Sequence, residues 1–222
     1  MKQVLYLGTD PTQFIDENAT VVHVPLIQIV PNDVHGFKIQ KQLEDLKEYT
    51  HFLLTSKHAV HIFMQAVKSC GALLEILQDK MFLAIGPSTS EALRQYGILN
   101  ISLPKVATQE GMMDLLDALD CTNAYFFYPR SAKARPVLSY YLRVRKLRHQ
   151  VCALYDTLDQ TAQVLPPLEQ FHEIIFTSPS TVEAFYRICQ HIPEHILIKS
   201  IGPITKAALD KYFLNRTIQI FT

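Results

Sequence analysis

Short apolar runs that end in Gly, Ser or Thr alternate with amphipathic stretches along the whole chain. This alternation is typical of βα units whose strands form a parallel sheet. The pattern therefore predicts an α/β fold. Strands are expected at residues 4–7, 51–54, 81–85 and 124–128 in the first half, and at 173–176, 196–201 and 218–221 in the second.

Amphipathic segments after these strands are expected to form helices. The segment 88–96 begins with Ser88 and Glu91, which have the spacing of a capping box. Ser180 and Glu183 repeat that spacing at the start of another expected helix, and one more helix is expected near Thr205.

Two motifs occur twice, in the same order and roughly 120 residues apart, which is the signature of an internal repeat. Residues 55–63 return as 177–185 with Thr-Ser at the start and Phe at the ninth position. Residues 84–93 return as 200–209 with Ile-Gly-Pro-x-Thr and Ala-Leu in register. We expect two similar lobes facing one another across a cleft, and a ligand in that cleft.

The second copy has no counterpart of the strand at 124–128 unless the N-terminal strand supplies it. One lobe is then discontinuous, and the chain must cross between the lobes twice, through the strand-like segments 21–31 and 151–157. Two neighbouring crossings in opposite directions can pair as an antiparallel ribbon. The expected division is 1–22 with 158–222 for lobe 1, 33–149 for lobe 2, and 23–32 with 150–157 for the linker strands.

Composition limits the partners of the chain. Its 222 residues include 21 Lys and Arg and 21 Asp and Glu, so no net field attracts nucleic acid or an anionic membrane. The four cysteines form no Cys-x-x-Cys pair, and no apolar leader follows Met1. We expect a monomeric cytoplasmic protein with a small-molecule partner.

In open parallel sheets, ligands bind where strands end and helices begin, because backbone N–H groups point into that crevice. Ser56, Ser178, Arg130 and Ser131 all fall at such junctions. Hydroxyls and amides in this number suit a ligand with several carboxylates or phosphates. Arg130 can bind a carboxylate with two hydrogen bonds. The alternative is that the serines only cap their helices.

Other constellations favour no further chemistry. His58 with His61, and His191 with His195, have helical spacing but no third ligand nearby, so no metal is expected. No Gly-x-Gly-x-x-Gly or Walker loop is present, so no nucleotide cofactor is expected. The cationic run at 143–148 is interpreted as a solvated helix face rather than a nucleic-acid contact.

Four motifs together resemble those of the uroporphyrinogen-III synthase family, over nearly the whole chain. They are Phe176-Thr-Ser-Pro-Ser180, Ile201-Gly-Pro-Ile-Thr205, Tyr128-Pro-Arg-Ser131 and Leu154-Tyr-Asp-Thr157. The resemblance implies two flavodoxin-like lobes with parallel sheets, joined by a two-stranded linker. It implies a lyase of tetrapyrrole and heme biosynthesis that uses no cofactor. Such an enzyme cyclises hydroxymethylbilane, a linear tetrapyrrole with eight carboxylates, to uroporphyrinogen III with inversion of ring D and loss of water.

The resemblance also implies roles for single residues. Tyr155 matches a tyrosine that faces the cleft, Thr89 and Thr205 match the Gly-x-x-Thr positions, and Ser178 matches the serine of the Thr-Ser loop. The Tyr155 phenol is a candidate general acid for the leaving hydroxyl, and the alternative is a packing tyrosine. Alternation along a strand predicts that Tyr155 lies on the same side as Val151 and Ala153.

One departure from the family concerns the end of the first strand. Family members often have an Arg there, whereas this chain has Thr9-Asp10-Pro11. Two other classes of protein remain open at this point. One is a two-lobe module that binds a small anion without catalysis, and the other is a nucleotide-sugar transferase, for which the chain is short.

Overall fold

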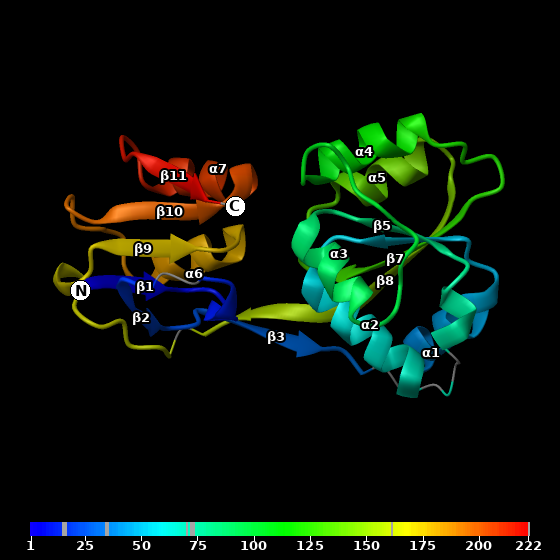
Figure 1. Ribbon diagram of the computed structural model, residues 1–222, viewed down its shortest axis with the longest axis horizontal. Coiled ribbons are helices and arrows are strands. Elements are labelled where there is room, and N and C mark those ends of the chain that lie inside the picture. The colour runs from blue at the N-terminus through cyan, green and yellow to red at the C-terminus, as the bar shows by residue number, and fades with distance from the viewer. Residues whose placement is uncertain (15–16, 34–35, 70, 72–73, 161, 222) are drawn as a thin grey trace. The chain divides into compact units, whose positions relative to one another are not determined.

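The computed structural model describes residues 1–14, 17–33, 36–69, 71, 74–160 and 162–221, and the chain divides into two compact units. Unit 1 consists of Met1–Ile29 with Thr157–Thr222, and unit 2 consists of Val30–Asp156. Each unit contains its own sheet, as Figure 1 shows. In the described ranges, no helix has the length and apolar character needed to cross a membrane.

Unit 1 has a five-stranded sheet in the order β11-β10-β9-β1-β2, and its neighbouring strands are parallel. Its strands are β1 (Lys2–Tyr6), β2 (Ala19–His23), β9 (Glu173–Phe176), β10 (Leu197–Ile201) and β11 (Ile218–Phe221). Its helices are α6 (Pro179–Ile188) and α7 (Gly202–Tyr212), with short 3₁₀ turns η1 (Pro11–Gln13) and η4 (Leu168–Gln170).

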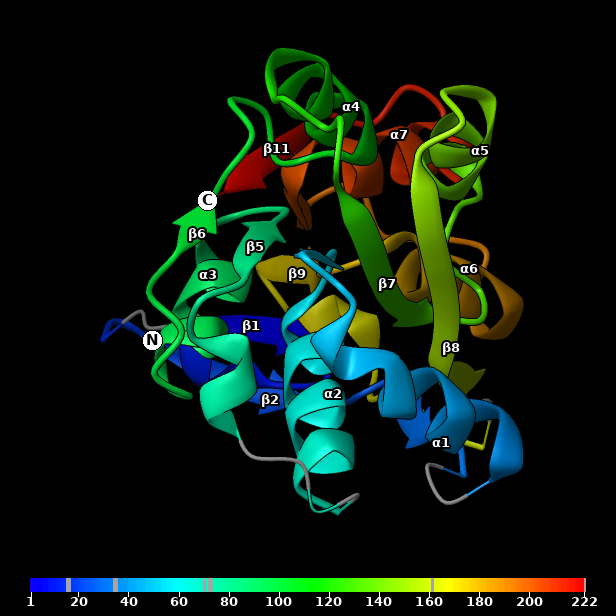
Figure 2. The same cartoon turned by 90° about the vertical axis from the view of Figure 1, so that its right-hand side faces the viewer.

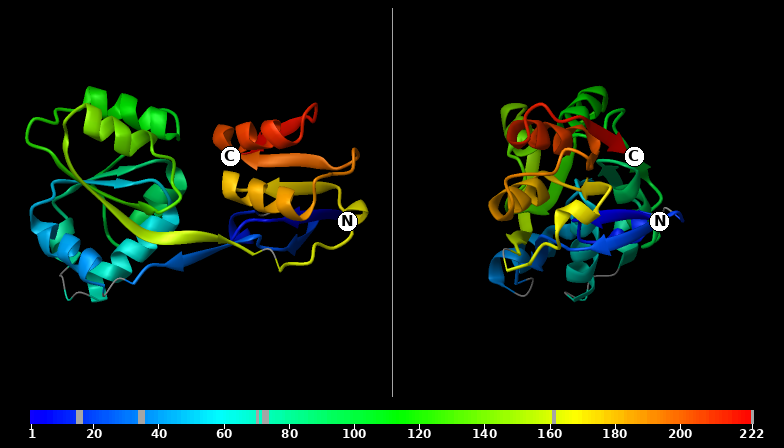
Figure 3. Two further views of the ribbon diagram at one scale, coloured as in Figure 1. Left: turned by 180° about the vertical axis from the view of Figure 1, so that it is seen from behind. Right: turned by 90° about the vertical axis from the view of Figure 1, so that its left-hand side faces the viewer.

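Alternation along β1 distributes its side chains between the two faces of this sheet. Leu5 and Leu7 belong to the core that contains Phe185 of α6 and Leu209 of α7. Figure 3 shows both helices in front of the sheet of unit 1 when the molecule is seen from behind. Val4 and Tyr6 belong to a smaller cluster, into which Phe14 packs after η1. Both faces of the sheet are therefore covered.

Unit 2 has a larger sheet in the order β3-β8-β7-β4-β5-β6. Its strands are β3 (Ile27–Pro31), β4 (His51–Leu54), β5 (Met81–Ala84), β6 (Ile101–Ser102), β7 (Tyr125–Ser131) and β8 (Arg148–Asp159). Its helices are α1 (Phe37–Glu44), α2 (Lys57–Ser69), α3 (Pro87–Arg94), α4 (Gln109–Ala118) and α5 (Val137–Val144), with 3₁₀ turns η2 (Asp45–Lys47) and η3 (Leu74–Leu77).

Helices cover both faces of this sheet, as a doubly wound fold requires. Leu53 of β4 and Phe126 of β7 share a core with Leu116 of α4 and Leu142 of α5. In Figure 2, α4 and α5 lie on one side of β7 and β8, while α1 and α2 lie on the other. The second face is aromatic, and the rings of Phe52 and Phe82 stack there with centroids 4.9 Å apart. The predicted α/β fold with parallel sheets is confirmed.

The two sheets share one strand order, but the chain enters that order at a different strand in each unit. The repeated motifs follow β4 and β9, and then β5 and β10, so these strands correspond. The order β8-β7-β4-β5-β6 then matches β2-β1-β9-β10-β11 strand by strand. β1 takes the place of β7, because β1 pairs with β9 as β7 pairs with β4. The expectation that the N-terminal strand completes the second copy is confirmed.

The segment 21–31 does not form one continuous crossing. Its first part belongs to β2 in the sheet of unit 1, and its last part is β3, which lies next to β8. The Gln160 amide donates to the Leu26 carbonyl, and the Asn32 amide donates to the Leu154 carbonyl, both at 2.8 Å. Residue numbers rise on one strand as they fall on the other, so this ribbon is antiparallel. β3 and β8 both pass from one unit to the other.

Both predicted capping boxes are wrong. The N-cap of α3 is Gly86 and that of α6 is Ser178, so Ser88 and Ser180 lie inside the first turns. In each case a proline follows the cap, and its fixed φ angle suits the first helical position. Each helix therefore begins at this proline, shortly after the strand. The serine of the Ser-x-x-Glu pattern already lies inside the helix and cannot cap it.

Candidate functional site

The connections of unit 2 reverse direction between β4 and β7. From β4 the chain proceeds outward to β5 and β6, and it then returns to the other side of β4 for β7 and β8. In open α/β sheets the ligand crevice lies at such a switch point, outside the carboxyl ends of the strands. Ser56 follows β4, Arg130 and Ser131 end β7, and Tyr155 lies on the neighbouring β8.

The side chains of Ser56 and Tyr155 meet at this edge. Their oxygen atoms are 2.8 Å apart, a hydrogen-bonding distance in which either hydroxyl can be the donor. The Ala59 amide also donates to Ser56 Oγ at 3.0 Å, so Ser56 caps the first turn of α2. One serine therefore links the start of α2 to a tyrosine two strands away in the sheet.

Burial changes the acidity of the Tyr155 phenol. The Tyr155 side chain is buried, with 5% of its surface exposed. Burial raises the pKa of Tyr155 above its ordinary value, and the nearby Tyr128 adds to this, while the hydrogen bond with Ser56 and the charge of Arg130 oppose it. The phenol is therefore protonated at neutral pH and can act as a hydrogen-bond or proton donor.

A β-bulge orients Tyr155. Arg130 pairs with Ala153, but the next residue, Ser131, pairs with Tyr155, so β8 contains one extra residue, Leu154. A bulge of this kind shifts the alternation of side chains, and such bulges are common next to active sites. Ala153 is exposed whereas Tyr155 is buried. The prediction that alternation places these two residues on the same side is wrong, because the bulge intervenes.

Arg130 is engaged with its own loop. Nε donates to the Ser131 carbonyl at 3.0 Å, Nη1 to Ser139 Oγ at 3.3 Å, and Nη2 to the Ala134 carbonyl. The guanidinium also lies 5.7 Å from the ring centre of Tyr128. Three of its five N–H groups hold the loop between β7 and α5 in the described structure, which leaves two for another partner. The sequence pattern gave no indication of this loop-holding role.

The Ser131 hydroxyl takes part in a local turn. The residue is 8% exposed, and its Oγ accepts a hydrogen bond from the Lys133 amide at 3.2 Å. Thr89 lies in the first turn of α3 and is buried. Unit 2 thus carries five of the predicted site residues: Ser56, Thr89, Arg130, Ser131 and Tyr155.

Unit 1 carries the other two, Ser178 and Thr205. Ser178 caps α6, since its Oγ accepts from the Thr181 amide at 3.2 Å and lies 2.9 Å from Thr181 Oγ1. Thr205 is buried in the first turn of α7. Gly8 stands where unit 2 has Arg130, and a Cβ atom there would come within 2.6 Å of Thr177. The switch point of unit 1 therefore has no room for an arginine at this position.

Asp10, the residue at which the chain departs from the family, caps a 3₁₀ turn. Its Oδ1 accepts a hydrogen bond from the Thr12 amide at 3.0 Å and lies 2.6 Å from the Thr12 hydroxyl. Its carboxylate therefore serves the turn η1.

Tyr128 is a residue that the sequence reasoning did not single out. Its phenol is buried, and burial raises its pKa, while an interaction with the Thr55 side chain and the charge of Arg130 oppose this shift. An aromatic residue directly before a Pro-Arg-Ser junction is the sequence signal that could have indicated it.

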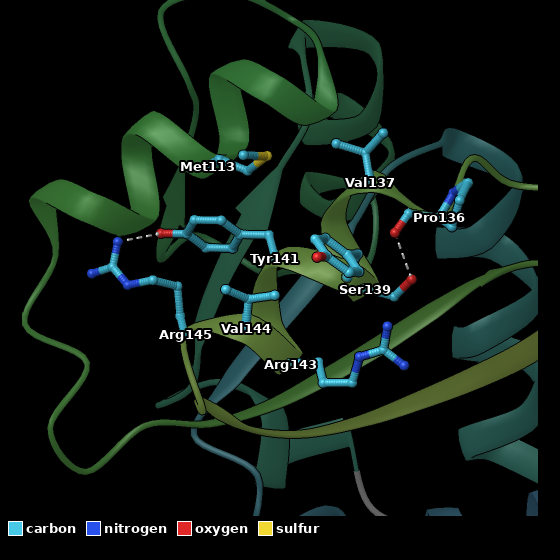
Figure 4. A pocket seen from close by; sticks show the side chains of 9 residues that line it. Met113, Pro136, Val137, Ser139, Tyr141, Arg143, Val144 and Arg145 are labelled. Carbon is cyan, nitrogen blue, oxygen red and sulfur yellow. Dashed lines mark hydrogen bonds between the residues drawn. The ribbon is translucent and has the colours of Figure 1, made fainter.

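A pocket of about 710 Å³ lies elsewhere in unit 2, beside α5 (Figure 4). Its lining is mostly apolar and includes Met113 and Tyr140, and none of the predicted site residues belongs to it. At its rim, Arg143 stacks on the Tyr140 ring at 5.3 Å and Arg145 forms an ion pair with Asp117. These contacts agree with a solvated face for the cationic run. Within the described ranges, no group of three His, Cys, Asp or Glu side chains could hold a metal ion.

Comparison with known proteins gives a consistent result. The family described as Uroporphyrinogen-III synthase HemD matches residues 12–219. A protein of Chlorobaculum parvum described as uroporphyrinogen-III synthase is 25% identical over 202 residues, which cover 87% of this chain and 79% of that protein. The porphyrin biosynthesis protein HemD of Ruminiclostridium josui is 25% identical over 98% of this chain, which spans 42% of the length of that relative.

Solved structures share the fold. Uroporphyrinogen III synthase of Thermus thermophilus matches with a TM-score of 0.69 at 19% identity, covering 100% of this chain and 93% of the other. The corresponding protein of Helicobacter pylori matches with a TM-score of 0.66 at 16% identity, covering 98% and 92%. Because the family match extends over nearly the whole chain, this protein belongs to the uroporphyrinogen-III synthase family.

Proposed function

We propose that the chain cyclises hydroxymethylbilane to uroporphyrinogen III, with inversion of ring D and loss of water. The family match over residues 12–219 carries this proposal. A buried, protonated tyrosine at the switch point of unit 2 supports it chemically, because the reaction must expel a hydroxyl group and a hydroxyl leaves readily only with a proton.

Tyr155 is the proposed catalytic residue. Its phenol donates a proton to the hydroxyl on ring A, the C–O bond breaks, and water leaves. The resulting azafulvene is attacked by the substituted carbon of ring D, and the spiro intermediate fragments and closes again. The last pyrrole to regain aromaticity releases one proton, which restores the phenol, so the net change is loss of one water molecule.

The choice of isomer is proposed to depend on positioning. Direct closure gives the uninverted product, so the enzyme must hold the chain in the geometry of the longer route. Eight carboxylates on the substrate offer the handles for this. We propose that hydroxyls and amides near Ser56, Thr89, Ser131, Ser178 and Thr205, with the two uncommitted N–H groups of Arg130, bind them. A monomer in the cytoplasm, without nucleic-acid or membrane partners, is part of the proposal.

The test is to incubate the protein with hydroxymethylbilane, oxidise the products and separate the porphyrin isomers by chromatography. Isomer III is expected with the active protein and isomer I with heat-inactivated protein. If the active protein yields only isomer I, the proposed activity is wrong. Binding of uroporphyrinogen III without any turnover would favour the alternative, a non-catalytic module for small anions.

A further inference from the structure

We infer that Ser56 is a positioning residue that acts through Tyr155. Its hydroxyl donates to the phenol oxygen, directs the phenol proton towards the leaving hydroxyl, and stabilises the phenolate that forms when this proton is transferred. The inference rests on the proposed function and refines it: the Ser56 hydroxyl serves Tyr155, so carboxylate binding near Ser56 is left to the neighbouring backbone amides.

The proposed proton transfer requires one direction of this hydrogen bond. A serine hydroxyl has one donor and two acceptor positions, and one acceptor position of Ser56 is taken by the Ala59 amide at 3.0 Å. If Tyr155 donated to Ser56, the only phenol proton would be committed to that bond. A phenol that gives its proton to a ligand must therefore accept from Ser56, across the 2.8 Å that separates the two oxygens.

The environment of Ser56 favours this role. Its oxygen lies at the N-terminus of α2, a helix of 13 residues, where the helix dipole is positive. A hydroxyl that accepts an N–H bond also becomes a better donor, because successive hydrogen bonds polarise one another. The sequence of bonds runs from the Ala59 amide through Ser56 to the Tyr155 oxygen. This pair of hydrogen bonds makes the electrostatic potential more positive at the Tyr155 oxygen, which becomes negative when the phenol loses its proton.

Other groups near Tyr155 do not replace Ser56. Among the described residues, the side-chain hydrogen-bond partner of the Tyr155 phenol is Ser56. Arg130 acts on Tyr155 only through its charge and donates its own hydrogen bonds to Ser131, Ser139 and Ala134. Loss of the Ser56 hydroxyl therefore removes the hydrogen-bond donor that the described residues offer to the developing phenolate.

The proton-transfer step is balanced without any further reactant. The phenol O–H bond breaks, the proton joins the hydroxyl oxygen of ring A, and water leaves with the electron pair of the C–O bond. Ser56 keeps its own proton throughout. The proton that the final pyrrole releases converts the phenolate back to the phenol.

The experiment compares Ser56→Ala and Ser56→Thr in two backgrounds, one with Tyr155 intact and one with Tyr155→Phe. In the first, Ser56→Ala should lower kcat by about 10- to 100-fold, the range for removing one hydrogen bond to a charged group, and leave KM within about twofold. Ser56→Thr, which keeps the hydroxyl, should restore most of kcat. In the Tyr155→Phe background, Ser56→Ala should change kcat by less than about threefold, because no phenolate forms there.

The pH profile gives an independent readout. Without the Ser56 hydrogen bond, the pKa of Tyr155 rises further, so the alkaline decline of kcat should shift to higher pH. Thr108→Ala is the matched control, because Thr108 caps α4 in the same unit through an equivalent 3.0 Å bond to the Gly111 amide and does not contact Tyr155. This variant should lose stability as Ser56→Ala does and keep the wild-type kcat and pH profile.

The inference fails if Ser56→Ala has the wild-type kcat and profile, or if it lowers kcat by the same factor in both backgrounds. Failure of the proposed function looks different: either the wild-type protein yields no isomer III, or Tyr155→Phe alone retains full activity.

Discussion

Replacing Tyr155 by Phe tests the centre of the proposed mechanism. The substitution removes one oxygen atom and keeps the ring that fills this buried site. A positioned general acid contributes roughly 10²- to 10⁴-fold, or about 3 to 5 kcal/mol of the barrier. We expect kcat to fall by that factor with KM nearly unchanged, since the phenol acts on the leaving group and not on the carboxylates. The residual product should remain isomer III, because positioning selects the carbon that attacks.

Loss of stability cannot account for such a fall. The Tyr155 hydroxyl makes one neutral hydrogen bond in the described structure, to Ser56, and such a bond contributes about 1 kcal/mol. A protein of this size should then melt only about 2–4 °C lower. Even a protein stabilised by only about 5 kcal/mol would stay more than about 99% folded at 25 °C after this loss.

The assay is the rate of isomer III formation from hydroxymethylbilane, with thermal melting measured on the same samples. Tyr140→Phe is the control, because it removes a phenol oxygen from an exposed position on α5. It should be indistinguishable from wild type. A folded Tyr155→Phe protein with the wild-type kcat would refute the assignment.

Four further predictions follow from other contacts. Arg130→Ala should lower the melting temperature by several degrees and increase proteolysis between β7 and α5, because the guanidinium holds that loop; limited proteolysis with an intact loop would contradict this. Glu173→Gln should destabilise the fold by about 1–3 kcal/mol in denaturant melts, because Glu173 is buried in ion pairs with Lys2 at 2.5 Å and Lys199 at 3.0 Å, and both lysines are partly exposed. Burial lowers the pKa of His51 below its ordinary value. The stability that neutral His51 contributes is therefore full above about pH 6.5 and is lost as the pH falls towards the lowered pKa. His51→Gln should reduce the acid-induced drop in melting temperature. Activity should survive dialysis against chelators, since the sequence has no metal or phosphate-loop motif, and recovery only on adding a metal would overturn this expectation.

Local sequence pattern was sufficient for most of the central strands and for the repeat. The expected strands at 51–54, 173–176 and 218–221 coincide with β4, β9 and β11. Short apolar runs between turn residues are typical of strands, and those of β4 and β9 are largely buried. The repeated motifs also led to the N-terminal strand as the missing member of the second sheet. The pairing of β1 with β9 could be predicted by counting strands, because each copy of the repeat needs the same set of strands.

Helix starts were decided by the chain's path rather than by the cap pattern. Ser178 and Ser180 both have the residue type of a cap, and only Ser178 occupies the position between the strand and Pro179. A capping pattern defines a helix start only if the backbone turns there, and in this fold the end of β9 determines where it turns.

The candidate site divides in the same way. The sequence by itself placed Ser56 and Arg130 at strand ends, because parallel strands carry their ligand-binding residues there. Tyr155 was singled out by the family resemblance, within the linker segment 150–157. Only the tertiary structure joined Ser56 to Tyr155 and committed Arg130 to its own loop. The physical reason is that hydrogen-bond partners far apart in sequence depend on strand order, and side-chain direction depends on a single extra residue in β8, Leu154.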